Sequence, residues 1–255
     1  MDGGDAPRSG SSRSLTVRQT GRVPALITWW SQDADPLVPS ATHEAVVDAG
    51  ARLLAAWTEP HRAYHSTRHL VELFWALEEL AEAGAMNAGD APLLRVAGWF
   101  HDAAYDPTAG PGSNERASAA LARRELEALG AADAVVAEVE RLVLLTIDHR
   151  AEGGDGGHGG DGAGSPPGDD ASRRRARAFC DADLWILAAD GDRYAEYTAQ
   201  VRQEYAHVPD DAFRAGRRAG LEHLAEGSVY ATSHARRAWG PAAARNGTGE
   251  LADRA

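Results

Sequence analysis

Apolar residues in this chain recur every three or four positions, and the alternation typical of a half-buried strand is nearly absent. The pattern is clearest over 69–80 and again over 93–101. The first of these segments carries His69, Leu70, Leu73, Phe74, Leu77 and Leu80. An α-helix has 3.6 residues per turn and gathers such positions on one face, whereas a strand alternates them with a period of two. The sequence therefore predicts an all-α fold.

Residues that favour helix ends divide the chain into segments. Asp90 followed by Pro92 is typical of a helix start. Gly130 is typical of the position just after a helix. The predicted helices cover residues 40–57, 69–83, 90–105, 113–130, 133–146, 175–189, 190–207 and 209–227. Together they predict a single helical bundle.

Three segments contain too few large apolar residues to enter a core. They are 1–21, 151–172 and 240–255, which are rich in Gly, Ser, Ala and charge. We expect disordered tails at both ends and a Gly-rich, disordered surface insertion at 151–172, in which His158 is solvated. A long surface loop costs little closure entropy, so the insertion requires no domain boundary. The remainder of 22–239 is predicted to form one domain.

The formal net charge of -12 argues against a general nucleic-acid binder, which would present a basic surface to phosphates. A small phosphorylated metabolite remains compatible, because one pocket can be positive on an acidic protein. No apolar run approaches the roughly 18–20 residues that cross a bilayer. The N-terminus lacks the apolar region of a secretory signal. The sequence thus predicts a cytoplasmic protein without membrane segments.

All 26 basic residues are arginines, and the chain contains no lysine. This excludes Schiff-base chemistry, a catalytic lysine base and the lysine of a P-loop. The single cysteine, Cys180, excludes an intramolecular disulfide and a Cys-rich zinc site. Any metal ion must therefore be held by His, Asp and Glu.

Three histidines lie close together in the segment HRAYHSTRH: His61, His65 and His69. On a helix, residues four apart lie on one face, about 6 Å from each other. That separation suits a shared ion, or an acid beside a metal. The alternative is that His65 and His69 are two partly exposed histidines near a helix start.

The pair His101-Asp102 ends a strongly apolar predicted helix. An uncompensated charge would be costly to bury there. Neighbouring residues on a helix differ by about 100°, so both side chains can converge on one ion at the helix end.

Asp181 and Asp183 lie among large apolar residues in FCDADLWIL. About 200° separates them on a helix, so both cannot point into one site. We expect one to be a ligand and the other to be a cap, an arginine partner or exposed. The alternative for either residue is a buried carboxylate paired with an arginine of 173–177.

Polar residues also mark the edges of two further helices. Asn114-Glu115 starts one, and Asp148-His149 follows Thr146 near the end of another. Helix capping explains Asn114, and an interaction with the helix dipole explains His149. The alternative is that these residues belong to a catalytic site.

These motifs and their order resemble the HD-domain superfamily of metal-dependent phosphohydrolases. The order is YHSTRH, then FHD, then a late Asp in DADL, on a helical chain. The fuller set adds FHDAAYDP, SNERASAALA, LTIDH, FCDADLWIL and VRQEYAHVP, and is similar to small bacterial proteins described as predicted HD-superfamily phosphohydrolases. The resemblance spans about 22–239.

The resemblance implies a divalent cation held by His69, His101, Asp102 and Asp183. Asp183 is preferred over Asp181 because it directly precedes the Leu of the ADL-like pattern. The cyclic-nucleotide phosphodiesterase branch shares the YHxxxH pattern, in which the second His binds metal and the first protonates the leaving oxygen. By that likeness, His65 is the candidate general acid, and His65 and Asp102 are the candidate catalytic residues.

Such a donor set suits Mn²⁺, Fe²⁺, Zn²⁺, Ni²⁺, Co²⁺ or Mg²⁺. A bound cation lowers the pKa of water from about 15.7 toward about 7, which supplies hydroxide to attack phosphorus. Glu115 and His149 are candidates to orient water or hold a second ion. Candidate phosphate ligands are Arg62, Arg68 and Arg202.

The predicted function is therefore hydrolysis of a phosphate ester or anhydride in a nucleotide or another small phosphorylated metabolite. One alternative is an HD-fold di-iron oxygenase, for which Glu115, Asp148 and His149 would supply the additional ligands. The other is a non-catalytic HD-fold binding module. The sequence leaves the substrate, the metal and the oligomeric state open.

Overall fold

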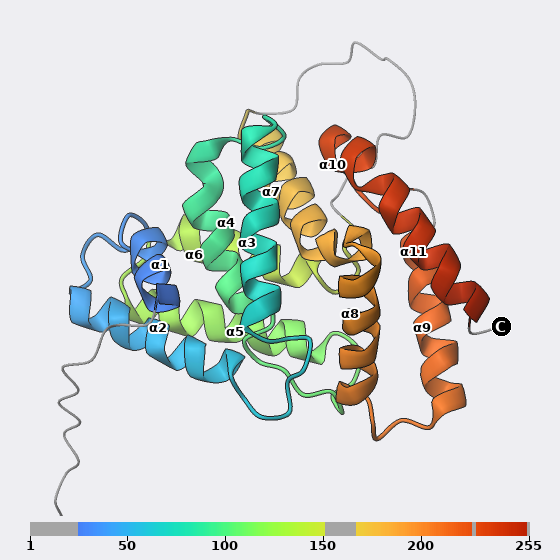
Figure 1. Ribbon diagram of the computed structural model, residues 1–255. Coiled ribbons are helices and arrows are strands. Elements are labelled where there is room, and N and C mark those ends of the chain that lie inside the picture. Colours follow the sequence, from blue (N-terminus) through green and yellow to red (C-terminus); the bar gives the residue numbers. More distant parts are fainter. Residues whose placement is uncertain (1–24, 151–166, 226–227, 254–255) are drawn as a thin grey trace, which may run out of the picture.

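The computed structural model describes residues 25–150, 167–225 and 228–253. Over these residues the chain forms eleven α-helices, two short 3₁₀-helices and no strand, which confirms the predicted all-α fold (Figure 1). None of the described helices is both long enough and apolar enough to span a membrane.

Thirteen helical elements cover most of the described residues. In order they are α1 (Ala25–Ala34), α2 (His43–Trp57), α3 (Thr67–Glu82), η1 (Ala88–Asp90), α4 (Ala91–His101), α5 (Ser113–Ala128), α6 (Asp133–Leu145), α7 (Pro167–Asp183), η2 (Leu184–Ala188), α8 (Gly191–Glu204), α9 (Asp210–Ala225), α10 (Ser233–Ala238) and α11 (Gly240–Asp253).

Helix α4 lies at the centre of the bundle. It packs against α1, α3, α5 and α6, and its last six residues, from Val96 to His101, are all buried. Gly98 lets α3 come close: a Cβ at this position would lie 3.0 Å from Leu73 Cδ2 and 3.1 Å from Phe74 Cε1. The close approach of α3 and α4 brings the end of α4 next to the start of α3.

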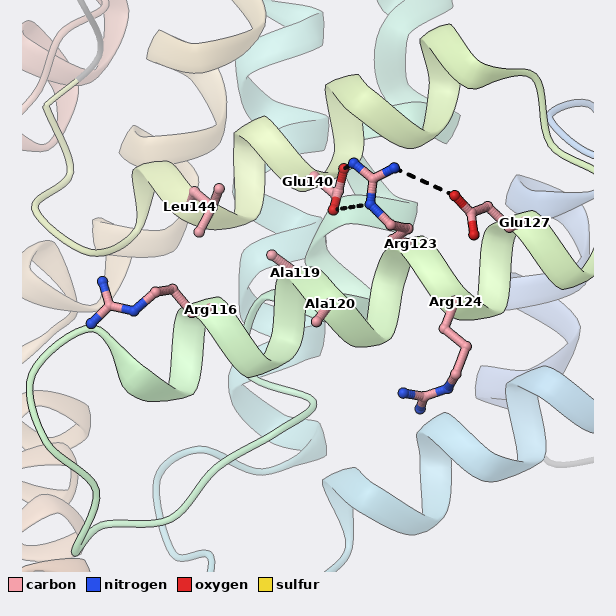
Figure 2. Close-up of a pocket in the computed structure, with 8 residues that line it drawn as sticks. All are labelled: Arg116, Ala119, Ala120, Arg123, Arg124, Glu127, Glu140 and Leu144. Atoms are coloured by element: carbon pink, nitrogen blue, oxygen red, sulfur yellow. Dashed lines mark hydrogen bonds and ion pairs between the residues drawn. The ribbon is translucent and has the colours of Figure 1, made fainter.

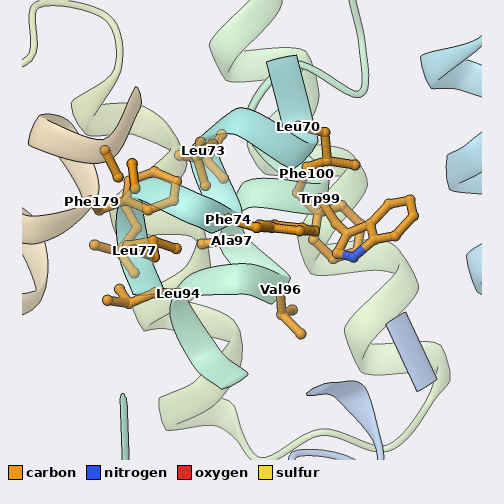
Figure 3. Packing of buried hydrophobic residues seen from close by; sticks show 14 of the residues in the cluster. Leu70, Leu73, Phe74, Leu77, Leu94, Val96, Ala97, Trp99, Phe100 and Phe179 are labelled. Carbon is orange, nitrogen blue, oxygen red and sulfur yellow. The ribbon is translucent and has the colours of Figure 1, made fainter. Parts of the chain in front are cut away.

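The core is built from the apolar faces that the helical spacing predicts. Leu70, Leu73, Phe74 and Leu77 of α3 pack with residues of α4 and with Phe179 of α7 (Figure 3). Burying one such side chain contributes about 1.5–3 kcal/mol. Two indole N–H groups join the helices further, since Trp57 donates to the carbonyl of Trp99 and Trp30 to that of Val46.

Most helix starts and ends lie within about four residues of the predicted positions, but the helix predicted at 175–189 begins at Pro167 as α7 and continues after Asp183 as the 3₁₀-helix η2. Asp190 caps α8, because its carboxylate accepts the N–H of Arg193. Gly130 follows α5 with φ of +74°, the left-handed conformation that favours glycine. Asp90 makes no side-chain cap, and the 3₁₀-helix η1 precedes α4 instead. Helix α1 was not predicted, although Ile27, Trp30 and Ala34 recur at helical spacing and are buried.

Two predicted disordered segments are wrong in part. Residues 240–253 form α11, although few large apolar residues lie there. Polar contacts hold α11 in place: the Asn246 amide donates to the carbonyls of Leu187 and Ala189, and buried Glu250 accepts from the Tyr194 hydroxyl. The insertion predicted at 151–172 also ends earlier, because α7 begins at Pro167. Residues 1–21 and His158 lie outside the described residues.

Candidate metal centre

The start of α3 and the ends of α4 and α7 lie next to one another. His69 lies in the first turn of α3, His101 is the last residue of α4 with Asp102 directly after it, and Asp183 ends α7. Helices α3, α4 and α7 contact one another pairwise. The fold thus brings together all four residues that the resemblance implies as ligands.

The donor atoms of these residues converge. His69 Nε2 lies 3.1 Å from His101 Nε2. Asp183 Oδ1 lies 3.0 Å from His69 Nε2 and 3.2 Å from His101 Nε2. Asp102 Oδ2 lies 3.1 Å from His101 Nε2 and 3.8 Å from His69 Nε2. His69, His101 and Asp183 form the tight core of the cluster, which Asp102 joins beside His101.

These spacings fit one divalent cation. Ligand atoms about 2.0–2.2 Å from an ion lie about 2.8–3.1 Å apart at a right angle and about 3.3–3.6 Å apart at a tetrahedral angle. The His101 ring supports the fit, because its Nδ1 is 2.8 Å from the carbonyl oxygen of Gly98. That oxygen only accepts, so Nδ1 carries a proton, and in the neutral form of the ring Nε2 presents its lone pair to the cluster.

The two carboxylates of the cluster are held in the charged form. Burial by itself would raise the pKa of Asp183, but His101, His149 and His69 hold that pKa well below its usual value. The pKa of Asp102 is lowered against burial in the same way, by His101 and His65. In turn, Asp102 and Asp183 raise the pKa of His101 although burial opposes this. The carboxylates and the imidazoles of the cluster therefore stabilise one another's charged forms.

No protein-family model, curated protein or solved structure matches this chain. The resemblance to the HD-domain superfamily therefore rests on the motifs.

His149 reaches the cluster from the end of α6. Its Nε2 lies 2.8 Å from Asp183 Oδ2, the oxygen that faces away from His69 and His101. His149 has φ of +55°, which is uncommon for a residue with a side chain. This strained backbone places the ring beside Asp183. The predicted position of His149 next to the ligands is thus met.

His65 is held beside the cluster by Glu204, the last residue of α8. His65 Nδ1 lies 2.6 Å from Glu204 Oε2, and His65 Nε2 lies 4.0 Å from Asp102 Oδ2. Burial would lower the pKa of His65, but Asp102 and Glu204 raise it. The His65 ring also stacks on Tyr105, with 4.3 Å between the ring centroids. His65 is therefore oriented on two sides.

Glu204 itself is buried and was not predicted as a site residue. Besides His65 Nδ1, it accepts the N–H groups of Ala63, Tyr64 and His65 and the hydroxyl of Tyr105. Burial would raise its pKa, yet these donors lower it to about 2. The motif VRQEYAHVP contains Glu204, but the sequence does not show that this carboxylate meets a residue 139 positions earlier.

Arg62 has a structural role rather than the predicted contact with phosphate. Its side chain is fully buried and donates to the carbonyls of His65, Asp102 and Ala103. Its Nε–H donates to Glu59. Arg62 thus ties the loop that carries His65 to the end of α4.

The other predicted residues lie outside the cluster. Arg68 pairs with Glu72 and Glu196, and Arg202 donates to the carbonyls of Tyr205 and Val208 and to Asp210. Glu115 lies in the first turn of α5, and its charge acts on Tyr205. His61 Nε2 is 3.0 Å from the carbonyl oxygen of Tyr105. Among the contacts given for the described residues, none joins these four to the ligand atoms.

Asp181 points away from the cluster. It is buried, and its carboxylate accepts the N–H of Ala231 at 2.6 Å and that of Thr232 at 2.8 Å. Burial raises the pKa of Asp181 despite these bonds. The structure therefore separates the two acids, with Asp183 at the histidines and Asp181 at the backbone before α10.

Proposed function

We propose that this protein is a metal-dependent phosphohydrolase. The observation that carries the proposal is the convergence of four donor atoms where three helix ends meet. The Nε2 atoms of His69 and His101 lie 3.1 Å apart, and one oxygen each of Asp183 and Asp102 lies 3.0–3.8 Å from both nitrogens. A second observation adds to it: an oriented histidine lies directly beside this cluster.

The donor set would hold one divalent cation, of the Mn²⁺, Fe²⁺, Zn²⁺, Ni²⁺, Co²⁺ or Mg²⁺ kind. When bound, the cation supplies a water of lowered pKa and neutralises charge on phosphoryl oxygens. Asp102 and Asp183 hold the ion by charge, and His69 and His101 by their Nε2 lone pairs. Tyr64, whose hydroxyl is 3.0 Å from His69 Nδ1, and Gly98 fix the two rings.

His65 is the proton donor in this proposal. Its Nδ1 bonds to Glu204, so the second proton of the cationic ring is on Nε2, on the side of Asp102. As the bond between phosphorus and the leaving oxygen breaks, that oxygen takes the proton from His65 Nε2. A pKa raised by Asp102 and Glu204 keeps His65 charged for this step.

The substrate class that fits is a phosphate ester or anhydride of a nucleotide or another small phosphorylated metabolite. Arg62 is no longer proposed as a ligand for the phosphate, since its guanidinium is bonded to the protein. We also retain the predicted cytoplasmic location, with which the buried, free Cys180 is compatible.

The test joins metal analysis to a phosphate-release screen over nucleotides and sugar phosphates. Asp102→Ala is expected to lose both bound metal and phosphate release. Asp106→Ala is the matched control, because Asp106 is exposed, follows four residues later and bonds only locally to Thr108. Full activity with stoichiometric metal in Asp102→Ala would contradict the proposal, as would oxygen consumption by iron-loaded protein without phosphate release.

A further inference from the structure

A second polar pocket lies at the opposite end of helices α3 and α7. It has a volume of about 280 Å³ and is lined by the turn after α3, by α7 and by the segment 231–237. His69 is in the first turn of α3, whereas Ala83 and Gly84 follow its last turn, so about 20 Å of helix lies between the two sites. In Figure 1, α10 lies beside this end of α3.

Arginines line this pocket, which we call the basic pocket, although the chain carries a net charge of -12. Arg174 and Arg177 come from α7, and Arg236 and Arg237 from α10. His234 also lines it. Among the described residues of the lining, none is Asp or Glu. Four guanidinium groups around so small a volume create a local positive field.

A groove between α5 and α6 shows that arginines alone do not produce such a field. Arg116, Arg123 and Arg124 line it, but so do Glu127 and Glu140 (Figure 2). Arg123 pairs with both carboxylates, so charge is compensated inside the groove. In the basic pocket, Arg174 pairs with Asp170, His234 pairs with Glu79, and the charge of Arg236 acts on Asp181. Arg177 also has an interaction partner. None of these three carboxylates belongs to the lining, whereas Glu127 and Glu140 do belong to the lining of the groove.

The wall of the basic pocket is fixed before any ligand arrives. Ala231 and Thr232 line it, and their N–H groups are held by buried Asp181 of α7. The Thr232 hydroxyl in turn accepts the N–H of Ala235. A wall that is already ordered loses little conformational freedom on binding, which favours affinity.

We propose that the basic pocket binds a compact oxyanion of two or three linked phosphate groups, either free or as the polyphosphate of a nucleotide. The planar guanidinium fork matches two phosphoryl oxygens at once. Several adjacent phosphates match four clustered cations better than a single monoanion does. A volume of about 280 Å³ suits a small molecule rather than a polymer.

The test measures binding of inorganic triphosphate by calorimetry to the full-length protein after metal has been removed with a chelator and dialysed away. Removing the metal removes the cation to which a triphosphate would otherwise bind at the metal centre. Wild type is expected to bind one triphosphate. Arg237→Gln is expected to weaken binding about tenfold, and Arg174→Gln with Arg237→Gln more than that.

The matched control removes the same charge elsewhere: Arg116→Gln with Arg124→Gln alters the groove between α5 and α6 and should leave the affinity within about twofold of wild type. The four substituted arginines are all exposed, and the unfolding midpoint of each variant verifies that it folds. Vesicles carrying phosphoinositides and a single-stranded RNA are tested in parallel. Absence of triphosphate binding, equal losses in both pairs of variants, or binding only to the vesicles or the RNA would overturn the proposal.

Discussion

Asp181 and Asp183 are two residues apart on α7 and both have little exposure, yet their surroundings differ in kind. Asp183 faces the imidazoles of His69, His101 and His149, whereas Asp181 faces two backbone N–H groups. The pKa of Asp183 is held well below its usual value, and that of Asp181 is above it. Burial of an acid therefore does not identify its role.

The groups around the two acids differ in whether they can bind a further ligand. A backbone N–H is a fixed donor, so Asp181 is satisfied by the folded chain alone. The Nε2 atom of a neutral histidine that donates through Nδ1, as His101 does to Gly98, carries a free lone pair. Such an atom beside the His69 ring and the carboxylates favours a cation between them. Asp181 thus joins parts of the fold, whereas Asp183 belongs to the proposed metal centre. Four variants test this contrast.

The largest effect is expected from Asp183→Asn. This change removes a charged donor from the metal centre, so we expect metal affinity to fall by more than about 100-fold and phosphate release to be lost. Metal analysis and the substrate screen check this, with the free energy of unfolding measured alongside. An Asp183→Asn protein that retains metal and activity would remove the distinction between the two acids.

Asp181→Ala should affect stability instead. Two buried N–H groups, of Ala231 and Thr232, lose their acceptor, and we expect the free energy of unfolding to fall by about 2–4 kcal/mol. Chemical denaturation measures the loss, and Asp192→Ala, at an exposed position in the first turn of α8, is the control. Metal content should stay stoichiometric at temperatures where the variant is folded; loss of metal from folded protein would contradict the assignment.

His149→Ala should have a smaller effect on the same site. His149 contacts Asp183 Oδ2 and orients the carboxylate, so its removal is expected to weaken metal binding by about 10–100-fold. Titration with a metal-sensitive dye measures the affinity. His234→Ala, which breaks a pair with Glu79 at the other end of the bundle, is the matched control. Equal metal affinities in His149→Ala and His234→Ala would show that His149 does not support metal binding.

Glu204→Gln should give the most limited change, a shift in pH dependence. Glu204 helps to raise the pKa of His65, so its loss lowers that pKa and protonated His65 persists over a narrower range. The alkaline limb of the kcat profile should move to lower pH. Glu196→Gln, on the exposed side of α8, is the control. An unmoved limb would contradict His65 as the proton donor.

The role of Glu204 can also be tested without a substrate, by acid unfolding. The pKa of Glu204 is lowered from 4.5 to about 2, so its stabilising contribution is present above pH 4.5 and is lost as the pH falls toward 2. Acid unfolding of wild type should include this loss, and Glu204→Gln should lack it.

The parts of the structure that could be predicted depend on local spacing. The periodicity over 69–80 and 93–101 predicted α3 and α4, because a buried helix face needs apolar residues at every turn. Within the candidate site, the order of the motifs selected the four residues that the fold brings together. Helix α11 was missed, since its apolar face is small, with Ala243 and Leu251 at the core, and polar contacts such as those of Asn246 add to it.

The missed site residues depend on contacts between distant parts of the chain. Nothing near Glu204 in the sequence shows that it accepts the backbone N–H groups of the loop at 63–65. Arg62 was predicted to contact a phosphate because the sequence shows its charge. The sequence does not show the backbone carbonyl groups to which Arg62 donates. Distant partners decide both roles.

Gly98 has a consequence for the choice of metal. The absence of a side chain at Gly98 sets how near α3 and α4 lie, and its carbonyl oxygen fixes the His101 ring. One residue therefore influences both how near the Nε2 atoms of His69 and His101 lie to each other and the direction in which the His101 ring points. In the proposed metal centre, the packing at Gly98, three residues before His101, would therefore help to select cations by their radius. A methyl group at this position would push α3 and α4 apart and widen the space for the ion.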